Sequence, residues 1–217
     1  MKTGLVVITA LLVAALPAFA ATIPTGKSAT EIRAYYHSGD WNKAIAKQTT
    51  KAKAWLATRT RAKHAPRKPA IVIDIDETAL DNVKCLDAKN GIPFDPGVYA
   101  GCVVAFDAPA FKPVLSLFKR AKALKVKVFF VTARPDGIRD GTLKNLKAAG
   151  YTGKYELILQ PGDYTKDSKI PYKSGARKQI QGRGFKIIAN VGDQQSDLKG
   201  GYSERTYKLP NPIYLTQ

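Results

Sequence analysis

Three short apolar segments rich in Val, Ile and Phe constrain the fold of this chain more than any other feature of its sequence. They cover residues 70–73, 126–131 and 185–191. Continuous apolar runs of this kind are typical of strands that are buried on both faces in a parallel sheet. They are separated by helical patterns over residues 111–124, 136–149 and 174–182. The alternation predicts an α/β fold, a three-layer Rossmann-like sandwich with a central parallel sheet and right-handed crossovers.

Polar residues follow each predicted strand at the point where it ends. Asp74 and Asp76 come after the first strand, Thr132 after the second, and Asp193 after the third, with Asp197 four residues further on. In open α/β sheets, chemistry gathers at the carboxyl ends of the strands. We therefore expect these side chains to share one site.

These residue types meet the needs of phosphoryl transfer, in which positioning and charge stabilisation do most of the work. Asp74 is the candidate nucleophile, because a carboxylate can attack phosphorus and form an acyl phosphate. Asp76 is the candidate acid and base, which protonates the leaving alcohol and then deprotonates water. Thr132 and Lys173 are the candidate binders of the phosphoryl oxygens, and Lys173 stands just before the helix predicted at 174–182.

The remaining carboxylates predict magnesium as the cofactor. Asp193 and Asp197, together with Asp74, offer hard oxygen ligands. Mg²⁺ needs only a few carboxylates besides water and substrate oxygens, so this set is sufficient.

Four strings around these residues resemble the motifs of the haloacid dehalogenase superfamily of phosphatases. They are IDIDETALDN at 73–82, VTAR at 131–134, YKSGAR at 172–177 and NVGDQQSDL at 190–198. Over their full length they are similar to the class B acid phosphatase subfamily, which includes plant acid phosphatases and vegetative storage proteins. The resemblance spans Ile71 to Leu198, more than half of the chain.

The resemblance implies a Mg²⁺-dependent acid phosphatase that hydrolyses phosphomonoesters through an aspartyl-phosphate on Asp74. Asp76 would act as acid and base and would reach the metal through its main-chain carbonyl. The implied metal ligands are Asp74, Asp76, Asp193 and Asp197, the last in a supporting role, and the implied phosphate binders are Thr132 and Lys173. Small phosphorylated molecules, nucleotides among them, are the expected partners, whereas the motifs select neither one substrate nor an oligomeric state.

The segment after the first motif, about residues 80–110, is rich in Gly, Pro and Asp and contains Cys85 and Cys102. A long insertion in this place is more often functional than idle, and we expect a small cap over the active face. Export to an oxidising compartment would favour a disulfide between the two cysteines. Two buried free thiols are the alternative.

Residues 1–20 have the pattern of a secretory signal peptide, with Lys2, an uncharged apolar run, and Ala18 and Ala20 at the cleavage site. The apolar run is shorter than the roughly 20 residues of a transmembrane helix, and no other segment is apolar for that long. A retained anchor is the alternative to the periplasmic or secreted protein that we expect. Residues 21–69 should form an N-terminal helical extension, with helices at 30–36 and 40–63 and Asp40 as an N-cap, and residues 70–217 should form the phosphatase core.

The chain carries 35 Lys and Arg against 17 Asp and Glu, a formal charge of +18. Such a field attracts phosphorylated molecules, but it would equally attract nucleic acid or an anionic membrane surface. Many of the cations lie in residues 43–68, where they are also consistent with a solvated helix face. Two alternatives to the enzyme follow: a storage or binding protein on the same fold, and a cationic protein that binds nucleic acid or the cell envelope. We expect no specific nucleic-acid partner.

Overall fold

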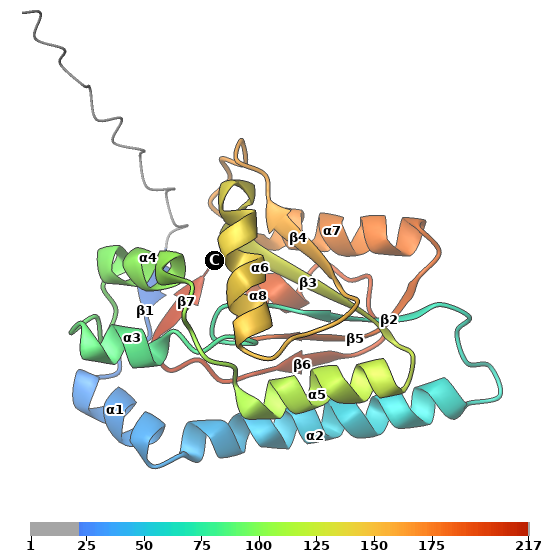
Figure 1. Ribbon diagram of the computed structural model, residues 1–217, viewed down its shortest axis with the longest axis horizontal. Helices are drawn as coiled ribbons and strands as arrows, with labels where there is room; N and C mark the ends of the chain where they lie inside the picture. The colour runs from blue at the N-terminus through green and yellow to red at the C-terminus, as the bar shows by residue number, and fades with distance from the viewer. Residues whose placement is uncertain (1–21, 217) are drawn as a thin grey trace, which may run out of the picture.

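The computed structural model of the protein describes residues 22–216, and the predicted signal peptide lies outside them (Figure 1). Its main sheet has five strands in the order β4-β3-β2-β5-β6, and every neighbouring pair is parallel. The strands are Pro69–Ile73 (β2), Lys127–Pro135 (β3), Glu156–Gln160 (β4), Lys186–Gly192 (β5) and Thr206–Lys208 (β6). The predicted α/β fold is confirmed, and the three predicted strands are the three central ones.

Helices cover both faces of this sheet. Helices α2 (Asp40–Arg61) and α5 (Lys112–Ala123) lie on one face, and α7 (Ile170–Gly182) lies on the other (Figure 1). Successive side chains of a strand point to opposite faces. Ile71 and Ile73 of β2 accordingly join the apolar cluster that contains α2 and α5, whereas Ala70 and Val72 join the cluster that contains α7.

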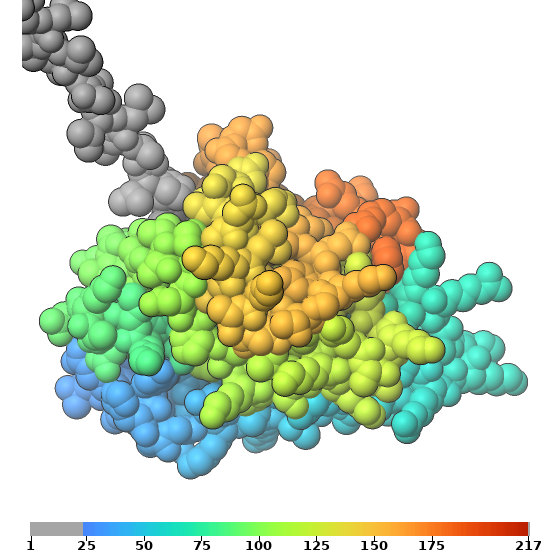
Figure 2. All heavy atoms as spheres, in the orientation of Figure 1, coloured from blue at the N-terminus to red at the C-terminus, as the bar shows by residue number. Residues whose placement is uncertain are grey.

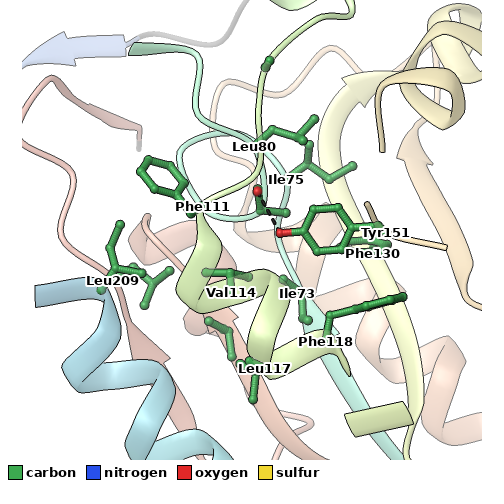
Figure 3. Packing of buried hydrophobic residues seen from close by; sticks show 14 of the residues in the cluster. Ile73, Ile75, Leu80, Phe111, Val114, Leu117, Phe118, Phe130, Tyr151 and Leu209 are labelled. Atoms are coloured by element: carbon green, nitrogen blue, oxygen red, sulfur yellow. Dashed lines mark hydrogen bonds between the residues drawn. The ribbon is translucent and has the colours of Figure 1, made fainter. Parts of the chain in front are cut away.

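The larger apolar cluster lies between α5 and the sheet, as Figure 3 shows. Phe118 of α5 stacks on Phe130 of β3 with ring centroids 6.0 Å apart, and Tyr151 meets both rings edge-on. The Tyr151 hydroxyl donates to the carbonyl of Ala79, 2.9 Å away. This contact ties the core to the chain just after the first motif.

Helix α2 of the N-terminal extension is part of this core. Ile45 and Leu56 are fully buried on its inner face, and the helix packs along α5. The indole N–H groups of Trp41 and Trp55 donate to the carbonyls of Pro210 and Ile188, each over 2.8 Å. Both tryptophans therefore fasten α2 to segments near the C-terminus.

The start of α2 differs from the prediction. Gly39, with φ 77°, is the residue before the helix, and Asp40 is the first helical residue, paired with Lys43. The preceding helix α1 (Ala29–His37) ends only two residues earlier, and the short connection requires a left-handed residue, which glycine adopts without strain.

The insertion after the first motif forms two short helices, α3 (Val83–Ala88) and α4 (Pro96–Ala105). A disulfide joins Cys85 of α3 to Cys102 of α4, as expected, and leaves no free thiol among the described residues. Arg33 and His37 of α1 both contact Asp87, and Figure 2 shows the green insertion resting on the blue N-terminal helix. The insertion is thus held against the N-terminal extension.

The ends of the described chain pair with each other. Ahead of the predicted helices of the N-terminal extension, β1 (Thr22–Pro24) forms an antiparallel pair with β7 (Tyr214–Thr216). Strands β1, β4, β6 and β7 escaped prediction because they are short or mix polar with apolar residues. The remaining elements are η1 (Asp136–Ile138), α6 (Arg139–Ala148) and α8 (Gln195–Leu198). Within residues 22–216, none of the helices combines the length and apolar character needed to cross a membrane.

Candidate active site

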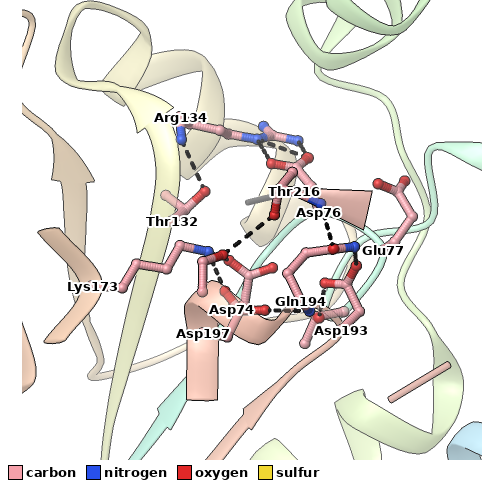
Figure 4. A network of polar contacts seen from close by, with 12 residues as sticks. Asp74, Asp76, Glu77, Thr132, Arg134, Lys173, Asp193, Gln194, Asp197 and Thr216 are labelled. Atoms are coloured by element: carbon pink, nitrogen blue, oxygen red, sulfur yellow. Dashed lines mark hydrogen bonds and ion pairs between the residues drawn. The ribbon is translucent and has the colours of Figure 1, made fainter. Parts of the chain in front are cut away.

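Asp74 and Lys173 meet at the carboxyl end of β2. The Asp74 amide donates to the Val191 carbonyl of β5 over 3.0 Å, which continues the sheet pairing up to the site. Lys173 Nζ lies 2.7 Å from Asp74 Oδ1 and also contacts Asp197 Oδ1 (Figure 4). Lys173 was expected just before a helix, but α7 begins at Ile170, so Lys173 lies in its first turn. Pro171 near the helix start explains the difference, because proline is well tolerated in a first turn.

Asp74, Asp193 and Asp197 form a buried group of carboxylates whose candidate ligand atoms all lie within 4.8 Å of one another. Burial raises the pKa of Asp74 well above its usual value, Asp197 adds to this, and Lys173 acts against it. Burial and then Asp197 also raise the pKa of Asp193. Three like charges in one buried pocket repel each other, and a divalent cation would relieve this repulsion. The group can therefore hold a hard metal ion.

The loop after β5 is shaped around Asp197. A Cβ added to Gly192 would lie only 2.3 Å from the Asp197 side chain, so this position has no room for another residue. The amide of Gln194 donates to Asp197 Oδ2 over 2.8 Å. Arg177 and Asn190 both donate to the Asp197 main-chain carbonyl. These contacts explain why a glycine precedes Asp193 in this motif.

Asp76 is held apart from the other three aspartates. Arg134 donates to both of its oxygens, with Nη2 2.7 Å from Oδ1 and Nε 3.0 Å from Oδ2, and Asn82 Nδ2 donates to Oδ1 over 2.9 Å. The side chain of Asp76 is 14% exposed, against 7% for Asp74 and 2% for Asp197. Its carboxylate lies outside the group of three that could hold a metal ion, and the contact of its main-chain carbonyl with a metal stays a prediction.

Thr132 and Arg134 lie on the extended end of β3, two residues apart and on one face of the strand. Both are buried, and the Arg134 amide donates to Thr132 Oγ1 over 3.1 Å. Tyr172, next to Lys173, donates its hydroxyl to the Thr132 carbonyl over 2.9 Å. The neighbour of Lys173 is therefore bonded to the backbone of Thr132, and this contact links the two predicted phosphate binders. Arg134 belongs to the second motif but was not among the predicted site residues. A buried arginine nevertheless requires an acidic partner.

A second set of buried polar residues surrounds the first motif. Glu77, fully buried with φ 52°, accepts from Asn82 Nδ2 over 2.9 Å and from the Tyr214 hydroxyl. The Tyr99 hydroxyl of α4 lies 3.1 Å from that of Tyr214. Burial raises the pKa of Glu77 well above its usual value, with Asp76 as the next cause. The periodicity of the sequence contains no signal for these contacts, because β7 and α4 are far from residue 77 along the chain.

A parallel sheet with covered faces, whose strand ends bring together aspartates and a lysine, defines a Rossmann-like α/β protein built for phosphoryl chemistry. Residues 11–217 match the family described as HAD superfamily, subfamily IIIB (acid phosphatase), and the chain belongs to this family. The family resemblance drawn from the four motifs is thereby confirmed.

Individual relatives include enzymes and storage proteins. Acid phosphatase 1 of Solanum lycopersicum is 36% identical over 151 residues, which are 66% of this chain and 57% of the tomato protein. The stem 28 kDa glycoprotein of Glycine max is 33% identical over 202 residues, 90% of this chain and 77% of that protein. Vegetative storage protein 1 of Arabidopsis thaliana is 31% identical over 147 residues, 66% of this chain and 54% of that protein. The chain thus spans little more than half the length of two of these relatives.

Solved structures show the same fold. The class C acid phosphatase from Bacillus anthracis superposes with a TM-score of 0.67 at 22% identity, covering 86% of this chain and 85% of that one. The tungstate-bound structure of the class C acid phosphatase from that organism has a TM-score of 0.68 at 22% identity and covers 86% of each chain. At this identity the likeness establishes the shared α/β architecture.

Proposed function

We propose that this protein is a Mg²⁺-dependent acid phosphatase that hydrolyses small phosphomonoesters, nucleotides among them, through an aspartyl-phosphate on Asp74. The observation that carries the proposal is the buried group of Asp74, Asp193 and Asp197 with the ammonium of Lys173 bonded to Asp74. Membership of an acid phosphatase family supports the same activity.

In the first step, a carboxylate oxygen of Asp74 attacks phosphorus and the bond from phosphorus to the ester oxygen breaks. Asp76 gives a proton to the departing alcohol. In the second step, Asp76 takes a proton from water, whose oxygen attacks the same phosphorus and releases inorganic phosphate and the Asp74 carboxylate. The larger exposure of Asp76 suits a group that meets the leaving alcohol. Lys173 and the Thr132 hydroxyl would hold the phosphoryl oxygens.

The residues present fit a hard divalent cation. Asp74, Asp193 and Asp197 offer only oxygen ligands, and the one ammonium of Lys173, which pairs with Asp74 and Asp197, leaves an excess of negative charge on the three carboxylates. Mg²⁺ bound there would neutralise charge on the carboxylates and on the phosphoryl group.

The deciding experiment measures phosphate release from a panel of monoesters with Mg²⁺ and with EDTA. The wild type should be active only with Mg²⁺, and Asp74→Asn should lose several orders of magnitude in turnover while it stays folded, because the nucleophile is gone. Asp40→Asn is the matched control, since Asp40 is exposed on α2 and pairs with Lys43 rather than with a residue of the site. Near-full turnover in Asp74→Asn would contradict the proposed intermediate.

A storage or binding role is the second candidate, supported by the similarity to a vegetative storage protein and to stem glycoproteins. The presence of both Asp74 and Asp76 favours the enzyme, because a non-catalytic relative has no need of the nucleophile. The same phosphate-release panel separates the two roles, since a storage protein would release no phosphate from any ester.

We also propose that the protein is exported to the periplasm or secreted, and that the mature chain begins at Ala21. The signal pattern of residues 1–20 and the disulfide between Cys85 and Cys102 support this, because disulfides persist in oxidising compartments. N-terminal sequencing of exported material is the test. Exported protein that begins at Met1 would contradict the cleavage site.

A further inference from the structure

The C-terminal segment, residues 209–216, runs beside the loop that carries Asp193. The Leu209 amide donates to the Gly192 carbonyl over 2.8 Å. Further along, the Thr216 amide donates to Gln194 Oε1 over 2.8 Å, and Gln194 Nε2 donates to the Tyr214 carbonyl over 3.2 Å. The segment is thus bonded to the loop at both of its ends, and Asn211 lies between these anchors.

The orientation of the Asn211 side-chain amide is determined by backbone N–H groups of the residues that follow it. Its Oδ1 accepts from the amides of Ile213 and Tyr214, over 2.8 and 3.3 Å. An amide oxygen that faces two N–H donors turns its NH₂ group to the other side. That group donates to Asp193 Oδ2 over 2.8 Å.

The two oxygens of Asp193 are occupied unequally. Oδ2 accepts two amide donors, Asn211 Nδ2 over 2.8 Å and Gln194 Nε2 over 2.5 Å, whereas Oδ1 accepts, from residues 22–216, only the Thr78 hydroxyl over 2.8 Å. An ionised carboxylate offers about four acceptor sites, two on each oxygen. Oδ2 is therefore filled, and Oδ1 retains one site.

We propose that Asn211, together with Gln194, is a positioning residue that turns Oδ1 of Asp193 toward the divalent cation by filling Oδ2. The inference rests on the proposed metal-dependent phosphatase function. The hydrogen-bond partners of a carboxylate ligand orient it and tune its affinity, and their loss costs about 10–100-fold in metal binding. Asn211 thereby connects the C-terminal segment to the chemistry of the site without touching substrate.

The test uses variants that remove the donor without removing the turn. Asn211→Ser keeps a short oxygen that can accept from the following amides but cannot reach Asp193. Gln194→Met removes the other donor at similar length and serves if Asn211→Ser folds poorly. The matched control is Thr25→Val, because the Thr25 hydroxyl donates to the carbonyl of Pro212 in the same segment and has no bond to Asp193. Asp193→Asn is the positive control for lost metal binding.

Mg²⁺ affinity is measured by calorimetry, melting temperature with EDTA and with Mg²⁺, and kcat and KM over a range of Mg²⁺ concentrations. Asn211→Ser and Gln194→Met should bind Mg²⁺ about 10–100-fold more weakly and recover most of the wild-type kcat at saturating Mg²⁺. Thr25→Val should bind Mg²⁺ as the wild type does.

Two results would overturn the inference. One is a wild-type Mg²⁺ affinity in Asn211→Ser with a lower melting temperature in EDTA, which would make Asn211 purely structural. The other is an equal loss of Mg²⁺ affinity in Thr25→Val. If the wild type releases phosphate in the presence of Mg²⁺, either result overturns only the role of Asn211. If the wild type neither binds Mg²⁺ nor releases phosphate, the proposed function is overturned as well.

Discussion

Asp76 and Asp74 stand two positions apart in the chain but have different surroundings. Asp74 is bonded to Lys173 inside the carboxylate group, whereas Asp76 is bonded to Arg134 and Asn82 outside it. This separation lets one carboxylate attack phosphorus while the other serves the leaving group, as a two-step phosphoryl transfer requires.

Asp76→Asn should therefore slow hydrolysis in proportion to how much help the leaving group needs. For alkyl phosphates we expect a loss of about 10²–10⁴-fold, the usual contribution of general acid catalysis, and for nitrophenyl phosphate a much smaller loss, because that alcohol leaves without protonation. Steady-state kinetics on both ester classes is the measurement. Asp81→Asn, in the same motif but bonded to Tyr36, is the control and should leave the ratio of the two rates unchanged.

The motif residues themselves were predictable because each stands beside a strand end that the apolar pattern reveals. Asp74 and Asp193 directly follow β2 and β5, Thr132 lies in the last part of β3, and the parallel sheet brings these ends together. Their supporting partners were not predictable in the same way. Asn211 lies outside the four motifs. Its bond to Asp193 depends on a turn near the C-terminus that no local sequence pattern predicts.

The insertion after the first motif consists of the two short helices α3 and α4. Its apolar residues Val83, Leu86 and Val103 are buried, but both helices are short and depend on neighbouring segments for packing. The disulfide between Cys85 and Cys102 closes a separation of 17 residues. In the loop-entropy account, a closed loop of this size stabilises a fold by about 3 kcal/mol.

Replacing both Cys85 and Cys102 by serine should lower the melting temperature by about 10 °C, the shift that about 3 kcal/mol produces in a chain of this length. Thermal denaturation followed by circular dichroism is the measurement. Reductant supplies the internal control: it should lower the melting temperature of the wild type and leave the double variant unchanged. A double variant as stable as the oxidised wild type would show that the bond adds nothing to the packing of α3 against α4.

Elements with a continuous apolar run or a clear helical pattern were predicted from sequence, and the remaining short strands were not. Helix α2 and strands β2, β3 and β5 follow from sustained periodicity, whereas β6 is a three-residue edge strand, Thr206–Lys208, that exists only because β5 offers it a partner. Helices α3 and α4 lie in the segment for which a small cap was predicted, but the sequence pattern did not indicate its helices. Tertiary contacts with α1, such as Arg33 with Asp87, help to hold α3, because a helix of only 6 residues is marginal on its own.

The positive charge of the whole molecule is only partly neutralised by local pairs. Lys43 pairs with Asp40, and Arg59 with Glu204. Lys47 and Lys51 of α2, however, line an open cavity of about 340 Å³ together with Lys208, and none of the residues that line it is acidic. Most of the basic stretch is thus helix α2, which has one face in the core and lines a cationic groove beside residues 208–210.

Variants of this groove distinguish the proposed phosphatase from a cationic protein that binds nucleic acid or the cell envelope. If polyanion binding were the function, affinity for DNA or for anionic vesicles should fall steeply between about 50 and 200 mM salt, and removal of groove lysines should weaken it. If the function is phosphoester hydrolysis, the groove contributes only long-range attraction of anionic substrates, which salt screens, while chemistry at Asp74 is unaffected.

The double variant Lys47→Gln/Lys51→Gln should therefore keep its kcat and its Mg²⁺ requirement, with at most a modest rise in KM at low salt. The control is Lys144→Gln/Lys147→Gln, which removes the same charge from the exposed side of α6, and phosphate release over a salt series is the measurement. Tight DNA or vesicle binding by the wild type that the groove variant alone abolishes, without phosphate release from any ester, would instead establish the binding protein.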